Sequence, residues 1–383
     1  MKKKIAILVL HLGIGGVERV ISSIANILCE KYEIEIISTY KLNEKPAFYL
    51  DERIQVKYLL EKEKPNREEF VQAVKTMNIV NIIKEGFKSI NTLILKKTKM
   101  VKAIKNLDAD IAISTRYIHN KWLGKYANKS IIKIAQEHNH HNDNKKYIKK
   151  VITSLKNIDY FMPTSMELTE FYKEKLKSTK TKTYFIQNSI DCYSNKVATL
   201  DSKNIISVGR LSKEKGFDDL IDIFEKVSVK CPEWSLKIVG DGVLYNELSM
   251  KIKEKNLGTK IELCGFKTRE ELDKLYLNSS IYVMTSHTES FGLVLVEAEN
   301  YGLPIVVFDS AQGAHEIVEN KRNGYFVQNR DKNEMAHKII ELIKNKDLRK
   351  KMGQEGKKMA KKYDKKIVSE LWYKFIDSCE KQI

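Results

Sequence analysis

Two carboxylates, Glu289 and Glu297, stand eight residues apart in the sequence and are separated by a largely apolar run. Residues 293–298 suit the start of a buried helix, and Phe291 and Gly292 suit the loop that enters it. On a helix, eight residues cover little more than two turns, so both acids can face one ligand from different depths. The N–H groups at a helix start also attract anions. The pattern predicts a ligand with phosphate and hydroxyl groups; the alternative is a capped helix with two solvated acids.

Two cations form a second candidate group. Arg210 and Lys215 lie five residues apart, after a strand predicted at 204–208. A guanidinium fork and an ammonium group on one loop can neutralise a diphosphate. A diphosphate leaving group gains charge as its bond breaks, so fixed cations stabilise the transition state more than the ground state. The alternative is a pair of surface salt bridges, with Glu214 or Asp218 as the partners.

The segment from Glu289 to Glu297 resembles the paired-glutamate motif of the family 4 retaining glycosyltransferases of bacterial surface-polysaccharide type, which have the GT-B fold. Three further segments, 207–216, 239–242 and 313–324, resemble other motifs of that family in the same order. Together they span roughly 120 residues. One such segment would be weak evidence, but four in the correct order make a specific pattern.

The resemblance implies a division of labour around a nucleotide-sugar donor. Glu297 would hold the ribose hydroxyls, and Glu289 the hydroxyls of the donor sugar. Arg210 and Lys215 would clamp the diphosphate. Backbone N–H groups of three residues would assist them: Phe291, Gly292 and Leu293. No metal ion or other cofactor is expected, because the nucleotide-sugar is a substrate and the cations neutralise its charge.

A glycine pair after the first predicted strand is the candidate of the first half of the chain. Gly15 and Gly16 open a predicted helix and could support a phosphate on their N–H groups. The dinucleotide fingerprint requires a third glycine where this chain has Glu18, so NAD binding is not indicated. The resemblance instead places Gly15 and Gly16 where acceptor and diphosphate meet. It places the main chain of Gly265 and Phe266 against the base.

Three histidines follow the strand predicted at 131–135. His138, His140 and His141 could suggest a metal cluster, but no Cys or carboxylate partners are arranged for one. In the family, a histidine at the end of the equivalent strand lies beside the transferred sugar. His138 matches that position best, His140 is second and His119 is weaker. The alternative for each is a surface histidine.

Strands and helices alternate along the whole chain, which indicates two open parallel sheets. Together with the resemblance, this alternation implies an α/β protein of GT-B fold, with two doubly wound Rossmann-like domains facing across a cleft. Residues 1–188 would form the acceptor-binding domain and 189–364 the nucleotide-sugar-binding domain. A last helix, 365–383, would cross back to the first domain. Ligands bind at the carboxyl ends of strands in such sheets. The last strand of the first domain is predicted at 184–187.

Composition agrees with a cytoplasmic protein. The 383 residues are 42% apolar and 31% charged, which suits two globular domains. The five cysteines are scattered and lack a C-x-x-C pair, which indicates free thiols in a reducing compartment. No run approaches the ~18 apolar residues that a bilayer crossing needs.

Positive charge is concentrated in the first half of the chain. Residues 1–189 hold 35 Lys and Arg against 20 Asp and Glu, which accounts for most of the total of +18. Apolar residues and lysines interleave over 79–105, as in basic amphipathic helices that lie on anionic membranes. Such a helix can equally pack on a sheet with a wet lysine face. Nucleic acid is not expected as a partner, because the lysines lack an aromatic stacking platform.

The sequence thus predicts a retaining, metal-independent glycosyltransferase. The donor would be a nucleotide-sugar, with a UDP-sugar favoured, and the acceptor a saccharide or lipid-linked saccharide in capsule or other surface-polysaccharide synthesis. The protein would be cytoplasmic, with peripheral attachment to the inner face of the cell membrane. Two alternatives are a nucleotide-sugar epimerase of GT-B fold and a catalytically silent nucleotide-sugar-binding protein.

Overall fold

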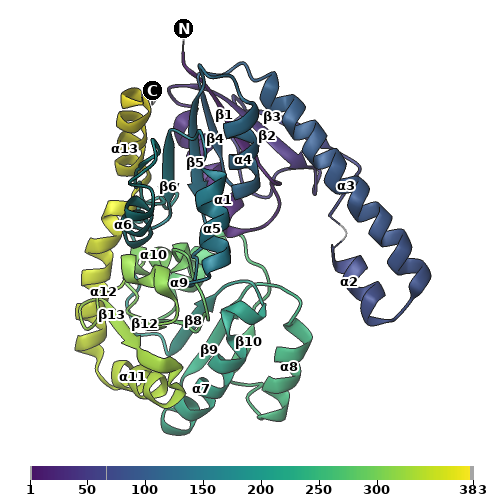
Figure 1. The fold of residues 1–383 in the computed structure, drawn as a ribbon. Helices are drawn as coiled ribbons and strands as arrows, with labels where there is room; N and C mark the ends of the chain where they lie inside the picture. Colours follow the sequence, from purple (N-terminus) through teal and green to yellow (C-terminus); the bar gives the residue numbers. More distant parts are fainter. Residues whose placement is uncertain (1, 66, 380–383) are drawn as a thin grey trace. The chain divides into compact units, whose positions relative to one another are not determined.

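The computed structural model describes residues 2–65 and 67–379 (Figure 1). The chain divides into two compact units. Unit 1 consists of Met1–Ile186 and Ser369–Ile383, and unit 2 of Gln187–Val368. Each unit is described by itself.

Unit 1 is built on a seven-stranded parallel sheet with the order β3-β2-β1-β4-β5-β6-β7. Its strands are β1 (Lys4–Val9), β2 (Glu33–Tyr40), β3 (Gln55–Leu60), β4 (Ile111–Ser114), β5 (Ile132–Glu137), β6 (Tyr160–Pro163) and β7 (Lys182–Thr183). Its helices are α1 (Gly16–Leu28), α2 (Arg67–Lys75), α3 (Ile79–Lys105), α4 (Tyr117–Tyr126), α5 (Lys145–Ser154) and α6 (Met166–Lys175). The strand order reverses direction between β1 and β4, so the loops after these strands leave the same edge at a topological switch point.

The core of unit 1 explains why its central strands read as unbroken apolar runs. Residues 5–9 of β1 and all of β4 are buried, as expected for parallel strands covered on both faces. One core cluster joins these strands to the helices through Met100 and Ile104 of α3 and Leu123 of α4. The residues of α13 (Lys365–Ser378) that belong to unit 1 add Phe375, which packs edge-on against Tyr160.

Helices α2 and α3 form an arm of unit 1. Phe70 of α2 lies 3.7 Å from the position that a Cβ at Gly86 of α3 would occupy, so the two helices pack closely. The last turns of α3 join the core, whereas its first turns run away from the sheet of unit 1 (Figure 1). The basic amphipathic segment predicted over 79–105 forms a single helix of 27 residues, α3.

Unit 2 is built on a six-stranded parallel sheet with the order β10-β9-β8-β11-β12-β13. Its strands are β8 (Asn204–Val208), β9 (Ser235–Val239), β10 (Ile261–Leu263), β11 (Ile281–Met284), β12 (Ile305–Phe308) and β13 (Gly324–Val327). Its helices are α7 (Phe217–Lys230), α8 (Tyr245–Glu254), α9 (Arg269–Leu277), α10 (Leu293–Asn300), α11 (Lys332–Lys344) and α12 (Lys346–Ala360), with the first residues of α13. Strands β8 and β11 flank the switch point of this sheet.

The strand predicted at 184–187 is wrong. Only Lys182 and Thr183 pair with β6, and the chain then leaves the sheet. Tyr184 is exposed and stacks on Phe375 at a ring separation of 4.5 Å, so its apolar character serves a side-chain contact outside a strand.

In the part of the chain that the structure describes, no helix is both long enough and apolar enough to cross a membrane.

Candidate active site

The loops that leave the carboxyl edge of the unit 2 sheet are fastened to one another by backbone hydrogen bonds. His287, after β11, donates its N–H to the Glu214 carbonyl of the loop after β8 at 2.8 Å. Gly313, after β12, donates to the Glu289 carbonyl at 2.8 Å. The loops after three neighbouring strands, β8, β11 and β12, are therefore joined at this edge.

Two glycines allow these loops to approach closely. Gly216 has a φ of 62°, and a Cβ there would lie 2.3 Å from the Thr285 carbonyl oxygen. A Cβ at Gly313 would lie 2.3 Å from the backbone nitrogen of Phe291. A side chain at either position would force the loops apart, so the small residues are required by the packing.

The predicted cation and the first predicted acid meet at this edge. Lys215 Nζ lies 2.6 Å from Glu289 Oε2, and both side chains are partly buried. The partner of Lys215 is therefore Glu289, and neither Glu214 nor Asp218 fills that role. Arg210 is exposed, and its guanidinium interacts electrostatically with Glu214. Lys215 is thus neutralised within the protein at close range, whereas Arg210 is exposed to solvent.

The second predicted acid lies deeper. Glu297, on α10, is fully buried, and Tyr276 donates its hydroxyl to Glu297 Oε2 at 3.1 Å. The guanidinium of Arg269 binds the other carboxylate oxygen. Arg269 also forms an ion pair with Asp273 at 2.8 Å. Burial of a carboxylate requires such partners, so Arg269 fixes both the charge and the orientation of Glu297.

The remaining donor-site candidates of unit 2 lie in two turns. Gly292 has a φ of 95° and precedes α10, whose N-terminus lacks a side-chain cap, so the N–H groups of its first turn are not engaged by a capping side chain. Phe291 is buried and Leu293 is half-buried. Gly265 and Phe266 form the turn between β10 and α9, and the Phe266 ring is 65% exposed.

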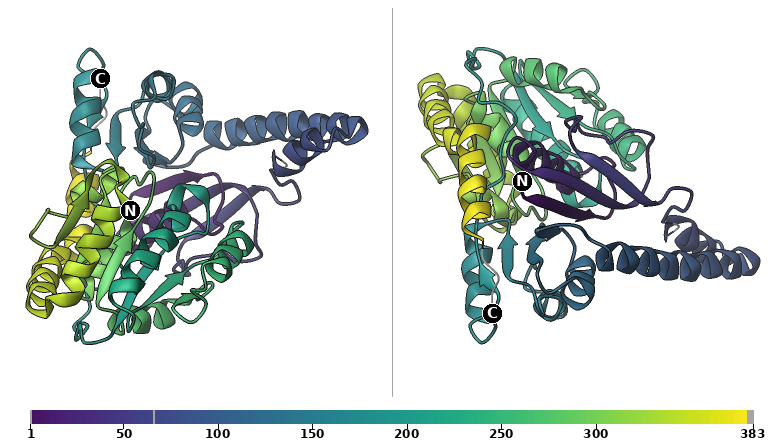
Figure 2. Two further views of the ribbon diagram at one scale, coloured as in Figure 1. Left: turned by 90° about the horizontal axis from the view of Figure 1, so that it is seen from below. Right: turned by 90° about the horizontal axis from the view of Figure 1, so that it is seen from above.

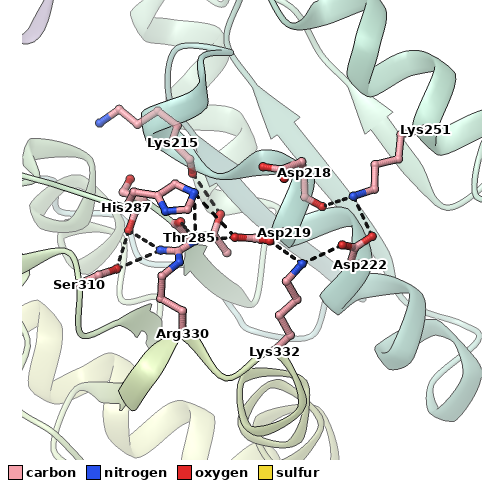
Figure 3. Close-up of polar contacts among 11 residues, drawn as sticks. Lys215, Asp218, Asp219, Asp222, Lys251, Thr285, His287, Ser310, Arg330 and Lys332 are labelled. Carbon is pink, nitrogen blue, oxygen red and sulfur yellow. Dashed lines mark hydrogen bonds and ion pairs between the residues drawn. The ribbon is translucent and has the colours of Figure 1, made fainter.

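An ion-pair network beneath the loop after β11 was not predicted from the sequence (Figure 3). Arg330 donates to the Thr285 and Ser286 carbonyl oxygens, each at 3.0 Å. It also binds Asp219 of α7 at 2.6 Å. Lys332 forms ion pairs with both Asp219 and Asp222 of α7. This network anchors the loop that carries Glu289, although nothing in the sequence around Arg330 distinguishes it from a surface cation.

The Lys215 side chain extends away from this network (Figure 3). Its backbone carbonyl accepts a hydrogen bond from the Thr285 hydroxyl at 3.2 Å. The main chain of Lys215 is therefore held by the anchored loop, while its ammonium group remains directed to Glu289.

In unit 1, the predicted residues also lie at the carboxyl edge of the sheet. Gly15 and Gly16 follow β1, and Gly15 is the N-cap of α1, without a side-chain cap. His138 follows β5 and is buried, and its Nε2 has no hydrogen-bond partner among the residues that the structure describes. Burial, with a contribution from the nearby Arg116, lowers the pKa of His138 to about 3. It is therefore a neutral imidazole at physiological pH.

Three further polar residues of this edge were missed. Glu18 is buried, and it accepts a hydrogen bond from Arg116 at 3.3 Å. His11 Nδ1 lies 3.6 Å from the same carboxylate. Arg116 thus links the glycine loop after β1 to the surroundings of His138. Arg116 follows β4 as an isolated cation that belongs to no recognised motif, so the sequence did not indicate this contact.

The other histidine candidates are placed differently. His119 is buried within α4, and its Nε2 lies 3.3 Å from the Thr39 hydroxyl. Burial, with contributions from two nearby cations, lowers its pKa to about 3. His140 is buried, and its Nδ1 lies 2.9 Å from the Asn142 side-chain oxygen. None of the three histidines matches the expected alternative of a mobile surface residue.

Comparison with known proteins identifies relatives of this chain. Residues 191–359 match the family model of glycosyl transferases group 1. An uncharacterized glycosyltransferase of Haemophilus influenzae is 28% identical over 97% of this chain and 99% of its own length. An amylovoran biosynthesis glycosyltransferase of Erwinia amylovora is 27% identical over 94% of this chain and 95% of its length.

A third relative is the Campylobacter jejuni N-acetylgalactosamine-N,N'-diacetylbacillosaminyl-diphospho-undecaprenol 4-alpha-N-acetylgalactosaminyltransferase, 26% identical over 95% of this chain and 96% of its length. Among solved structures, S. aureus TarM in complex with UDP superposes with a TM-score of 0.76 at 17% identity and covers 98% of this chain and 100% of its own. This last likeness establishes the fold.

The two parallel sheets agree with the GT-B fold of the solved structure, and the relatives identify the chain as a glycosyltransferase. The match to the glycosyl transferases group 1 extends over residues 191–359, which is most of unit 2. The resemblance predicted from the sequence is therefore confirmed.

The two buried neutral histidines predict acid sensitivity. Between pH 6.5 and about 3 the unfolded chain binds protons that His119 and His138 refuse in the folded protein, so stability falls as pH falls through this range. At pH 5 each histidine should lower the free energy of unfolding by about 2 kcal/mol. Urea unfolding should show that the free energy of unfolding falls less between pH 7 and pH 5 in the His119→Gln/His138→Gln variant than in the wild type. An equal loss in variant and wild type would contradict this assignment.

The burial of Glu297 predicts a strong coupling with Arg269. Arg269→Ala should lower the free energy of unfolding by about 3 kcal/mol, because it leaves a buried carboxylate without its ion-pair partner. Arg269→Ala combined with Glu297→Gln should recover part of that loss. Urea unfolding of the four proteins in this cycle measures the coupling, and strictly additive effects would show that the pair does not interact.

Proposed function

We propose that this glycosyltransferase moves a sugar from a UDP-sugar to a hydroxyl of a saccharide or lipid-linked saccharide, with retention of the anomeric configuration. The observation that carries the proposal is the ion pair between Glu289 and Lys215, which lies on the loop that also carries the exposed Arg210. A cation and a carboxylate that neutralise each other can each find a better partner in a donor that carries both phosphate and hydroxyl groups.

Donor binding would divide this pair. The diphosphate attracts Lys215 and Arg210, and the N–H groups at the start of α10 add positive potential. Once Lys215 turns to phosphate, Glu289 is free to accept hydrogen bonds from the sugar hydroxyls. Recognition of the diphosphate and recognition of the sugar are thereby coupled.

The nucleoside end would lie further along the same edge. Glu297 is held by Arg269, which begins α9 directly after the turn of Gly265 and Phe266. We assign the ribose hydroxyls to Glu297, with Arg269 as its positioning residue. Because the Glu297 carboxylate is fully buried and bound by Arg269 and Tyr276, donor binding must first expose it. We assign the base to the main chain of Gly265 and Phe266.

Unit 1 would supply the acceptor side. Gly15 and Gly16 offer uncapped N–H groups, and the unpartnered Nε2 of His138 can bind a sugar hydroxyl as a neutral imidazole. In the reaction, the bond from the anomeric carbon to the phosphate oxygen breaks and a bond to the acceptor oxygen forms on the same face. The acceptor proton passes to the departing diphosphate. The two cations balance the charge on that diphosphate, so the reaction is proposed to need no metal ion.

The comparisons support the choice of substrates. TarM was solved with UDP, which favours a UDP-sugar donor. The Campylobacter jejuni relative acts on a diphospho-undecaprenol saccharide, and the Erwinia amylovora relative serves amylovoran biosynthesis. We therefore propose an acceptor of the lipid-linked saccharide class, in synthesis of capsule or another surface polysaccharide. With such an acceptor, we propose that the protein works in the cytoplasm at the inner face of the cell membrane.

A donor screen tests the site. Ligand-detected NMR with UDP-, GDP- and ADP-sugars should show binding of a UDP-sugar to the wild type. Arg210→Ala should weaken that binding about tenfold or more, because a charge-assisted contact is lost. Lys213→Ala, an exposed cation of the same loop, is the matched control and should bind as the wild type does. Equal binding by Arg210→Ala and Lys213→Ala would refute the diphosphate assignment.

Product analysis separates the competing functions. With a UDP-sugar and a saccharide acceptor, the glycosyltransferase forms a new glycosidic bond. An epimerase would alter the nucleotide-sugar without an acceptor, and a silent binding protein would leave both compounds unchanged.

Gly16 offers a test that separates binding from packing. A Cβ at Gly16 would meet no atom within 4 Å, so Gly16→Ala should leave the unfolding transition unchanged. If acceptor and diphosphate meet there, transfer should fall about tenfold or more, since small misplacements are costly. Gly258→Ala, at another open glycine, should retain full transfer. Full activity of Gly16→Ala would remove this residue from the site.

A further inference from the structure

The outer face of α3 is apolar and exposed. Of the 22 exposed large apolar side chains among the described residues, ten fall between positions 71 and 94. On α3 they recur every three or four residues and so form one stripe. The stripe consists of Ile79, Ile83, Phe87, Ile90, Leu93 and Ile94. A contiguous exposed apolar surface of this kind marks an interaction site.

The contacts of unit 1 with the arm lie elsewhere. Phe70 and the buried Ala73 of α2 face α3 at the level of Gly86. Met100 and Ile104 attach the last turns of α3 to the core. In each view of Figures 1 and 2 the α2–α3 pair extends away from the sheet of its own unit. The stripe is therefore left over after the arm has made its intramolecular contacts.

The charge around the stripe selects the partner. Helix α3 contains seven lysines and one glutamate. Lys84 and Lys88 are exposed along one flank, and Lys97 is exposed where the stripe ends. Two copies of this helix, placed stripe to stripe, would bring like charges together. Anionic lipid headgroups would instead neutralise them while the acyl chains cover the apolar side chains.

We propose that the α2–α3 arm docks the enzyme on an anionic membrane surface, with the stripe of α3 at the boundary between headgroups and acyl chains. From Ile79 to Ile94 the stripe is about 22 Å long, at 1.5 Å per residue. Such a helix lies in the plane of the interface. This inference rests on the proposed function, because a lipid-linked acceptor is presented at the same surface.

Vesicle flotation tests the arm. The wild type should float with phosphatidylglycerol-containing vesicles and bind neutral phosphatidylcholine vesicles about tenfold less well or weaker. Phe87→Ser/Ile90→Ser and Lys84→Gln/Lys88→Gln should each lose most of the binding to anionic vesicles. The matched control is Val229→Ser/Val243→Ser in unit 2, which should float as the wild type does. Val229 is 75% exposed and Phe87 72%, so the removed apolar surface is comparable.

Fluorescence reports insertion directly. The three native tryptophans, Trp122, Trp234 and Trp372, are buried. In Phe87→Trp, the emission should therefore shift to the blue when anionic vesicles are added. An unchanged spectrum would overturn insertion of the stripe.

Three other outcomes would also overturn the proposal. They are equal binding to neutral and anionic vesicles, a dimer in solution that Phe87→Ser/Ile90→Ser dissociates, and arm-dependent binding to nucleic acid in place of vesicles. UDP binding is measured in the same preparations. If the wild type does not bind UDP, the proposed function is contradicted. If the wild type binds UDP but does not float with vesicles, only the membrane arm is refuted.

Discussion

The ion pair between Lys215 and Glu289 is the interaction on which the donor site depends. At 2.6 Å it joins the loop after β8 to the loop after β11, the two strands that flank the switch point of the unit 2 sheet. An unneutralised carboxylate beside a diphosphate site would repel the donor. In the proposed function, pairing with Lys215 neutralises this carboxylate until phosphate binding releases it to the sugar.

The scaffold around the pair limits where its two members can lie. Gly216 brings the loop after β8 against the Thr285 carbonyl, closer than any side chain would permit. Arg330 holds the same carbonyl from below, and Asp219 fixes Arg330. Glycine geometry and a partly buried ion-pair network thus hold the main chain, while the side-chain ends of the pair itself remain partly exposed. A main chain held in place, with side-chain ends that are partly exposed, suits a site whose side chains exchange partners when the donor binds.

Sequence reasoning succeeded where local pattern determines structure. Continuous apolar runs located β1 and β11, and the motif order located the carboxyl-edge loops. It failed at β3, whose half-exposed residues lack an apolar run, and at Arg330 and Arg269, which act on Thr285 and Glu297 from other parts of the fold. Partners distant in sequence are set by tertiary packing. No residue type or short spacing reveals them.

The most direct test of the central claim compares UDP affinity, by titration calorimetry, in the wild type, Lys215→Met and Glu289→Gln. If Glu289 competes with phosphate for Lys215, UDP without a sugar should bind Lys215→Met more weakly than the wild type. It should bind Glu289→Gln at least as tightly as the wild type, because the competitor is gone. Equal weakening in both variants would contradict the account, since Lys215 would then need Glu289 in order to bind phosphate.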